Sequence, residues 1–190
     1  MGKRKARTKD RILHKLKSVD YNQLMWKQTG FGVREFELWS GENLVGVLYW
    51  PKWLSDMAIA ECGDGTWAMD RIGFFRDRAV AFRAGTEEVL ANVTFDWAGD
   101  SDLTLSDGRR YQLFRTGFLS NNWTLSDENE DIVYKLREGT RWFKYDAEVD
   151  LQVGAIMLKE LPLLIFMGWY LAYMRLQDGA AAAAAVSAAS

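Results

Sequence analysis

The chain has 190 residues, 48% of them hydrophobic, with two prolines, which suits one globular domain and excludes the Pro-rich and disordered classes. Nine Trp, ten Phe and seven Tyr favour β-strands around a large aromatic interior. Cys62 is the single cysteine and His14 the single histidine, so an internal disulfide and a zinc cage are excluded. The basic N-terminus is not followed by an apolar run, so no secretory signal is expected and the setting is predicted to be cytoplasmic.

The net charge of −2 hides an asymmetry between the N-terminus and the rest of the chain. Residues 1–17 contain eight Lys or Arg and one acid, so they carry +7 and the remainder carries −9. We interpret residues 1–23 as a basic N-terminal arm in which Ile12, Leu13 and Leu16 are spaced for a short, weakly amphipathic helix. Such an arm is either a solvated tail or a segment attracted to anionic lipid or to nucleic-acid phosphate.

From residue 24 onward, apolar and polar residues alternate and turn residues recur at short spacing, which is typical of β-hairpins. Gly and Asp stand at or near the tips, where they favour turns. Five such units, with no helical period between them, predict an antiparallel barrel or sandwich. The units cover residues 35–50, 60–72, 81–95, 104–116 and 124–136, and a last strand is expected over 142–152.

Residues 153–177 contain the one long apolar helix candidate in the sequence. Residues 161–174 carry no charge, and apolar side chains occupy every side of the expected helix, which indicates complete burial. A helix of this length is about 21 Å long, whereas a membrane hydrocarbon core is about 30 Å thick. We therefore predict a core helix over 160–177, with Pro162 in its first turn, and keep a membrane anchor over 153–176 as the alternative.

A barrel of more than eight strands has an interior wider than strand side chains fill, and the apolar helix is the obvious plug. The predicted fold is mainly β: a closed antiparallel barrel of about 10–12 strands with a buried hydrophobic C-terminal helix along its axis. The barrel and its helix are expected to occupy residues 24–178. Residues 179–190 are Ala-rich and are predicted to form a disordered tail.

This order of elements, ending in LPLLIFMGWYLAYMRL at residues 161–176, resembles the tubby C-terminal-like group of proteins. That group comprises tubby proteins, phospholipid scramblases and LURP-one-related proteins. The resemblance covers about residues 24–178 and implies a barrel closed around its C-terminal helix, together with a binding or scaffold role. The cysteine-rich and proline-rich segments of the scramblases are absent from this sequence, and no phosphoinositide-binding position of the tubby proteins matches residue by residue.

The motifs that carry common chemistries are missing. Gly30-Phe31-Gly32 lacks the third glycine of a dinucleotide loop, and residues 126–131 lack the pattern of a calcium loop. His14 lies in the arm, and no base is evident beside Cys62 for nucleophilic catalysis. We therefore expect no catalytic residues, no metal site, no cofactor and no enzymatic activity.

Arginines of the body are the remaining candidates for a binding site, because the planar guanidinium suits phosphate. Four of them gather around Phe74, Phe75 and Phe82; cross-strand pairing with acidic residues is the alternative explanation. Together with the arm they form the predicted site for anionic lipid. Its members are Lys3, Arg4, Lys5, Arg7, Arg71, Arg76, Arg78 and Arg83.

The sequence thus predicts a non-enzymatic, intracellular binding or scaffold module, monomeric, with a peripheral contact to anionic phospholipid headgroups at a membrane surface. One alternative is a single-pass protein anchored by residues 153–176. Another is a nucleic-acid-associated protein that uses the basic arm, although nucleic acid is not the expected partner.

Overall fold

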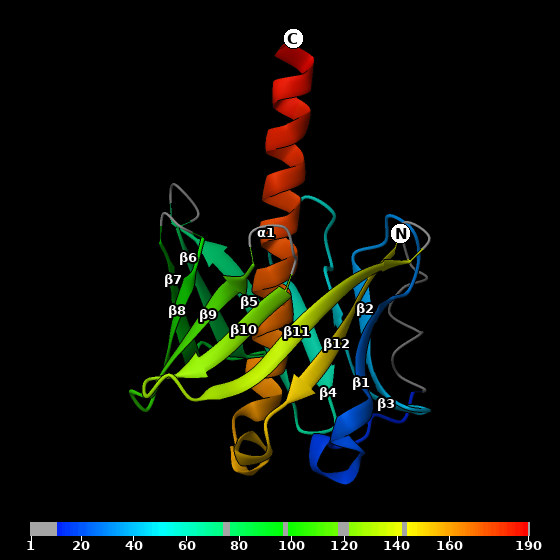
Figure 1. Ribbon diagram of the computed structural model, residues 1–190, viewed down its shortest axis with the longest axis vertical. Coiled ribbons are helices and arrows are strands. Elements are labelled where there is room, and N and C mark those ends of the chain that lie inside the picture. Colours follow the sequence, from blue (N-terminus) through cyan, green and yellow to red (C-terminus); the bar gives the residue numbers. More distant parts are fainter. Residues whose placement is uncertain (1–10, 74–76, 97–98, 118–121, 142–143, 190) are drawn as a thin grey trace.

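The computed structural model describes residues 11–73, 77–96, 99–117, 122–141 and 144–189. In these ranges, twelve antiparallel strands form one closed barrel in which each strand pairs with its neighbours in the chain and β1 pairs with β12 (Figure 1). The predicted fold class is confirmed. The strands are β1 (Leu24–Gln28), β2 (Glu35–Ser40), β3 (Asn43–Tyr49), β4 (Ala58–Cys62), β5 (Gly65–Ile72), β6 (Arg78–Arg83), β7 (Val89–Phe95), β8 (Ser101–Leu105), β9 (Arg110–Thr116), β10 (Asn122–Asp127), β11 (Ile132–Arg141) and β12 (Lys144–Leu151).

The five predicted hairpins correspond to the pairs β2–β3, β4–β5, β6–β7, β8–β9 and β10–β11. Burial alternates along several strands, as in β1 and β4, because successive side chains of a strand point to opposite faces of the sheet. The predicted last strand is β12; residues 142 and 143, which were expected to begin it, lie outside the described residues.

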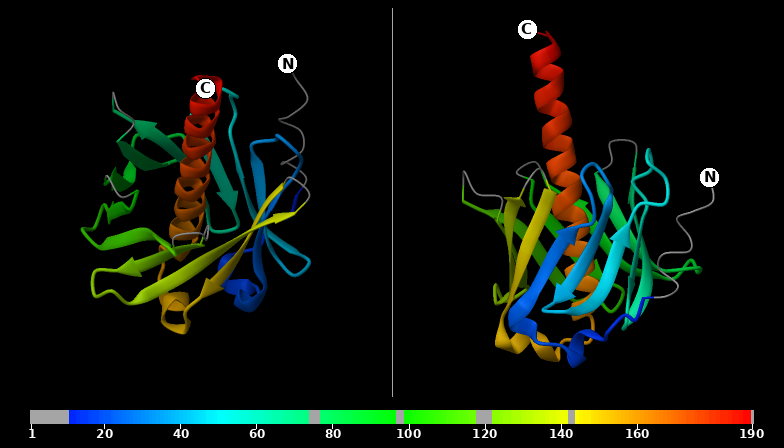
Figure 2. Two further views of the ribbon diagram at one scale, coloured as in Figure 1. Left: turned by 45° about the horizontal axis from the view of Figure 1, so that its top comes forward. Right: turned by 90° about the vertical axis from the view of Figure 1, so that its right-hand side faces the viewer.

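Helix α1 (Leu161–Ala189) runs inside the ring of strands and projects from one end of it (Figure 2). Every residue of 161–174 except Pro162 is buried, and Trp169 has no exposed surface. The prediction of a buried central helix is therefore confirmed, with a start one residue later than expected. We call the end of the barrel where α1 begins the entry end, and the end from which it projects the exit end.

In the described part of the chain, no helix combines the length and the apolar character that crossing a membrane requires. The apolar part of the segment 153–176, which was considered as an anchor, is surrounded by strands, while residues 153–157 form a separate 3-10 helix, η3 (Val153–Met157).

Residues 179–189 continue α1, so the prediction of a disordered tail was wrong for them. They have no apolar face to bury, and residues 178–188 are exposed. Helix formation follows instead from composition, because alanine is the best helix former and adding residues to an existing helix needs no new nucleus. Residue 190 lies outside the described residues.

The described part of the arm, residues 11–23, lies against the barrel. The backbone N–H of His14 donates to the Leu44 carbonyl at 2.9 Å, the N–H of Leu16 donates to Asp64 at 2.7 Å, and the Leu16 side chain is buried. These bonds hold the backbone extended, and two 3-10 helices, η1 (Leu16–Ser18) and η2 (Tyr21–Gln23), replace the predicted amphipathic helix. The domain therefore includes a segment that had been assigned to the arm.

The entry end is fixed by Glu160, the residue before α1. Its Oε1 accepts a hydrogen bond from the Tyr111 hydroxyl at 2.6 Å and a second from Arg109, which also pairs with Asp107 at 2.7 Å. A carboxylate at this point also interacts favourably with the positive, N-terminal end of the helix dipole. The contact ties α1 to β9 before the helix enters the barrel.

Candidate functional site at the exit end

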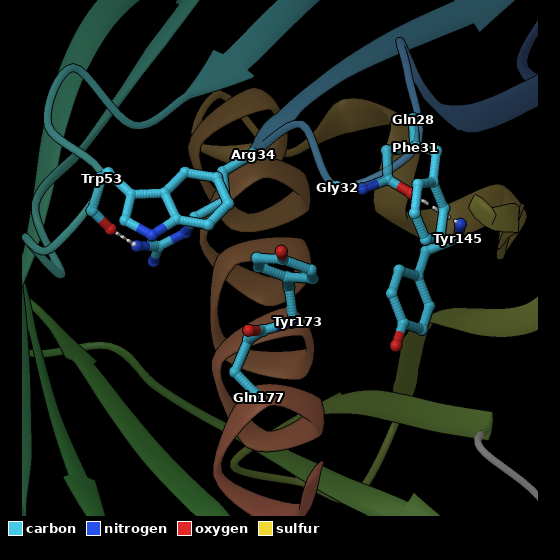
Figure 3. Close-up of a pocket in the computed structure, with 8 residues that line it drawn as sticks. All are labelled: Gln28, Phe31, Gly32, Arg34, Trp53, Tyr145, Tyr173 and Gln177. Atoms are coloured by element: carbon cyan, nitrogen blue, oxygen red, sulfur yellow. Dashed lines mark hydrogen bonds between the residues drawn. The ribbon is translucent and has the colours of Figure 1, made fainter. Parts of the chain in front are cut away.

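A cavity of about 390 Å³ lies at the exit end, between α1 and the part of the barrel where β1, β2 and β12 meet. This volume is within the range of small-molecule pockets in proteins. Four aromatic side chains, one arginine and two amides line it (Figure 3). The lining residues are Gln28, Phe31, Gly32, Arg34, Trp53, Tyr145, Tyr173 and Gln177.

Closure of the barrel assembles this cavity. Gln28 is the last residue of β1 and is buried. Its side chain forms hydrogen bonds with the loop before β2 and with β12. Its Nε2 donates to the Val33 carbonyl at 2.9 Å, and its Oε1 accepts from the Tyr145 backbone N–H at 3.0 Å. The loop that carries Phe31 and the strand that carries Tyr145 are therefore held on either side of Gln28.

Arg34 supplies the positive charge of the cavity. Its Nη1 donates to the carbonyls of Trp53 at 2.8 Å and Ser55 at 3.1 Å, and its guanidinium lies over the Trp50 ring at 4.7 Å. Its Nη2 lies 3.6 Å from the thioether of Met174, its side chain also bonds the Tyr173 hydroxyl, and its buried Nε has no hydrogen-bond partner among the described residues. No carboxylate of the described ranges lies within ion-pair distance, so its charge is not neutralised there.

The other polar groups of the lining are hydrogen-bond donors or can act as donors. Burial raises the pKa of Tyr173, and the nearby charge of Arg34 opposes that rise only in part, so the hydroxyl is protonated at neutral pH. Among the described residues, the Tyr145 hydroxyl and the Gln177 amide have no hydrogen-bond partner. In the described part of the lining there is no Asp or Glu, although the chain contains 26 acidic residues.

Three large apolar side chains are exposed on the loops around the cavity. Phe31, between β1 and β2, is 75% exposed; Trp53 and Leu54, between β3 and β4, are 65% and 91% exposed. We call these three residues the rim. Lys52 beside them is also exposed. Exposed apolar groups gathered on neighbouring loops are typical of a contact surface.

Arg71, a member of the predicted lipid site, faces into the barrel. Its side chain is 7% exposed and pairs with Asp178 of α1 at 2.9 Å. Its guanidinium also lies over the Phe95 ring at 5.5 Å. Arg71 therefore connects β5 to the emerging helix, and its position does not favour contact with a lipid surface.

The other predicted arginines do not join Arg71 in one patch. Arg78 begins β6 and is exposed near Asp77, on the outer face of the sheet. Arg83 ends β6 about 16 Å further along the strand, at 3.3 Å per residue, and pairs with Glu88 at 2.6 Å. The cross-strand pairing that was the alternative explanation thus fits Arg83. Lys3, Arg4, Lys5, Arg7 and Arg76 lie outside the described residues.

The exit end opposite the cavity is rich in compensating charges. Arg175 of α1 lies over the Phe95 ring at 4.6 Å, and its pKa is lowered by burial and then by the charge of Arg71. Burial and then the neighbouring Asp96 raise the pKa of Asp100. Arg175 has no ion pair among the described residues, and its buried Nε and Nη2 have no hydrogen-bond partner there, but the charges of Asp178, Asp96 and Asp100 act on it.

Among the described residues, no group of three or more His, Cys, Asp or Glu is arranged to hold a metal ion. Cys62 is buried, and burial raises the pKa of its thiol to about 11, which does not favour a thiolate nucleophile.

The architecture defines the class of protein: a closed barrel of twelve described strands with its C-terminal helix on the axis. An X-ray structure of an Arabidopsis thaliana protein is similar, with 17% sequence identity and a TM-score of 0.47; the match covers 77% of this chain and 94% of that one. No protein-family profile matches the sequence, and neither does any curated protein.

Sequence reasoning missed the cavity because its residues come from β1, two loops, β12 and α1. Two local signals were present: Phe31 stands between two glycines in a hairpin loop, and Trp53 and Leu54 stand in a loop with Pro51. Both signals are large apolar residues placed outside the expected strands. They indicated exposed contact residues, but not that Arg34 lies between them.

Proposed function

We propose that this protein is a non-enzymatic binding module whose exit end contacts an anionic membrane surface. The observation that carries the proposal is the rim, in which Phe31, Trp53 and Leu54 are exposed at the end of the barrel that also holds Arg34. The resemblance to the tubby C-terminal-like group supports a binding role by analogy.

Apolar contact supplies most of the attraction in this proposal. Fully burying one large apolar side chain contributes about 1.5–3 kcal/mol, so partial insertion of the three rim residues gives on the order of 4 kcal/mol. A basic residue near an anionic leaflet adds about 1 kcal/mol. Trp and Phe are also the side chains that suit the headgroup region, since their rings are large and the indole carries a polar N–H.

The arginines of the earlier prediction have a smaller part in this proposal. Arg71 is engaged with Asp178, and Arg83 lies toward the entry end with Glu88. Lys52, beside the rim, and Arg34, in the cavity, supply positive charge at the exit end instead. The basic residues of the arm, Lys3, Arg4, Lys5 and Arg7, stay as predicted contributors to electrostatic attraction.

Flotation with vesicles tests the proposal. The protein is mixed with vesicles of phosphatidylcholine alone or of phosphatidylcholine with phosphatidylserine, and we expect it to float mainly with the second. Replacing the rim by Trp53→Ser and Leu54→Ser is expected to abolish flotation while the melting temperature stays unchanged, because both side chains are exposed.

The matched control is the pair Val153→Ser and Met157→Ser in η3, which removes equally exposed apolar groups, 86% and 85%, from the entry end. If this pair abolishes flotation and the rim pair does not, the exit end is the wrong surface. Deleting residues 2–10 tests the arm separately: weaker flotation that salt abolishes would assign the electrostatic part to it. If no variant and no vesicle gives flotation, the membrane contact is refuted.

A further inference from the structure

We propose that the exit-end cavity is a binding site for one monoanionic oxygen acid, a carboxylate or a phosphodiester, attached to a flat or apolar body. The proposal concerns the interior of the cavity and goes beyond the rim's contact with a membrane. It holds for a free small molecule as well as for a lipid headgroup.

The positive charge of Arg34 indicates that the ligand is an anion. Among the residues that the structure describes, Arg34 is the one charged residue of the lining, and no carboxylate forms an ion pair with it. A guanidinium partly removed from water and without a counter-charge is unfavourable, so an anion in the cavity gains from neutralising it. The same balance limits the ligand to a single negative charge, because a second charge would meet no further cation among the described lining residues.

The hydrogen-bond donors of the lining indicate that the anion is an oxygen acid. The cavity brings together the guanidinium of Arg34, the hydroxyls of Tyr145 and Tyr173, and the amide of Gln177. These groups come from the β1–β2 loop, β12 and two turns of α1, and Figure 3 shows them around one space. Carboxylate and phosphodiester oxygens accept several hydrogen bonds at once, as this set of donors offers.

The aromatic rings of the lining indicate that the uncharged part of the ligand is flat or apolar. The rings of Tyr145 and Tyr173 meet edge to face with centroids 6.0 Å apart, and Phe31 and Trp53 stand at the mouth of the cavity with most of their surface exposed. A flat or apolar body placed between these rings would cover that surface and gain stacking contacts. A volume of about 390 Å³ restricts the body to a small ring system or a short chain.

Isothermal titration calorimetry on the full chain tests the site with four probes. They are 2-naphthoate, its neutral isostere 2-naphthamide, naphthalene-2,6-disulfonate with two charges, and dihexanoyl phosphatidylglycerol as a soluble phosphodiester. We expect 2-naphthoate to bind, and 2-naphthamide and the disulfonate to bind roughly tenfold more weakly or not at all. Binding of the naphthoate but not of the phosphatidylglycerol assigns the site to soluble ligands, and the reverse assigns it to lipid.

Variants locate the binding. Arg34→Gln is expected to weaken binding of the better probe roughly tenfold or more, whereas Arg110→Gln, which removes an exposed arginine near the entry end, leaves it unchanged. Because Arg34 also holds the loop of Trp53, Tyr173→Phe provides a second test that keeps the ring and removes only the hydroxyl; it is expected to weaken binding roughly threefold to tenfold.

Equal affinity for naphthoate and naphthamide, unchanged binding in both variants, or no binding of any probe would overturn the proposal. These results are separate from those of the flotation experiment. A protein that binds naphthoate but never floats keeps the cavity site and loses the membrane contact. A protein that floats through its rim but binds no probe keeps the membrane contact and loses the cavity site.

Discussion

The hydroxyl of Tyr134 reaches from β11 across the barrel interior and donates a 2.8 Å hydrogen bond to the carbonyl of Leu164 in α1. Both residues are completely buried. Gly168, one turn further along α1, has no side chain at the place the hydroxyl occupies, and a Cβ there would overlap it. The absence of a side chain at residue 168 therefore admits Tyr134, and the hydrogen bond sets the depth of the helix in the barrel.

Gly168→Ala is predicted to destabilise the fold by about 2–4 kcal/mol, since the added methyl group has no room beside the Tyr134 hydroxyl. Tyr134→Phe alone should cost about 1 kcal/mol, because Leu164 loses one hydrogen bond and no donor is left unsatisfied. The double variant should be more stable than Gly168→Ala alone, because removing the hydroxyl makes space for the methyl group. Urea unfolding of the four proteins measures this coupling.

Gly139→Ala is the control for the first prediction, because Gly139 lies in β11 with open space around it. Its effect should stay within about 1 kcal/mol. Additive costs in the double variant would show that Tyr134 and Gly168 do not compete for one space.

Gly63→Ala is predicted to release the N-terminal segment from the barrel. A Cβ at Gly63 would overlap the backbone of His14 and Lys15, which passes directly over it, and backbone cannot move aside as a flexible side chain does. The variant should lose the hydrogen bonds from His14 to Leu44 and from Leu16 to Asp64. Limited trypsin digestion should then cleave after Arg11, Lys15 or Lys17 at least tenfold faster than in the wild type, with the barrel itself protected.

Leu16→Ser provides an independent route to the same state, because it removes the buried side chain that holds the segment without touching Gly63. Cleavage of Gly63→Ala at the wild-type rate would show that the segment tolerates the methyl group and is not held by that close approach.

The hairpins and the central helix could be predicted from the sequence because each depends on local patterns. Alternation over five to eight residues with Gly or Asp at the turn is enough for a hairpin such as β8–β9. An uncharged run with apolar residues on every side is enough for a buried helix. The pairing of β1 with β12 joins Met25 to Glu148, and no local pattern indicates a pairing of that kind.

The cavity depends on that pairing, which explains why no local sequence pattern indicated its lining residues. Clustering in the sequence suggested that Arg71, Arg78 and Arg83 share a surface, but strand alternation turns Arg71 inward and Arg78 outward. Arg34 was overlooked as an isolated arginine in the loop before β2. Its proposed role rests on its place in the cavity without a carboxylate partner among the described residues, which only the folded chain reveals.

Glu138 is expected to make the stability of the folded protein depend on pH. It lies on the same face of β11 as Tyr134 and Leu136, and it accepts a hydrogen bond from the Trp123 indole at 3.0 Å. Burial raises the pKa of this carboxyl from 4.5 to about 7, although the Trp123 bond and the charge of Arg115 act in the opposite direction. Between these two values the folded state holds a proton that the unfolded state has lost.

The free energy of unfolding should therefore fall as the pH rises from about 4.5 to about 7, and the cost of a buried charge is complete above that window. Glu138→Gln removes the charge and keeps an acceptor for Trp123, so it should stabilise the protein at pH 8 relative to pH 5 by up to about 3 kcal/mol. Urea unfolding at both pH values measures the difference. Glu148→Gln, an exposed carboxyl on β12, is the control, and an equal response of the two variants would contradict a special position for Glu138.

Truncation separates the buried from the projecting part of α1. Ending the chain after Asp178 removes residues 179–190 and keeps the pair between Arg71 and Asp178, so the melting temperature should change by less than about 3 °C. Ending it after Tyr170 removes the buried side chains of Leu171, Tyr173 and Met174, at about 1.5–3 kcal/mol each. That loss is comparable with the whole stability of a domain, so the shorter chain should not fold. Circular dichroism and thermal unfolding distinguish the two, and a large drop in melting temperature for the longer chain would mean that the projecting helix contributes to the fold.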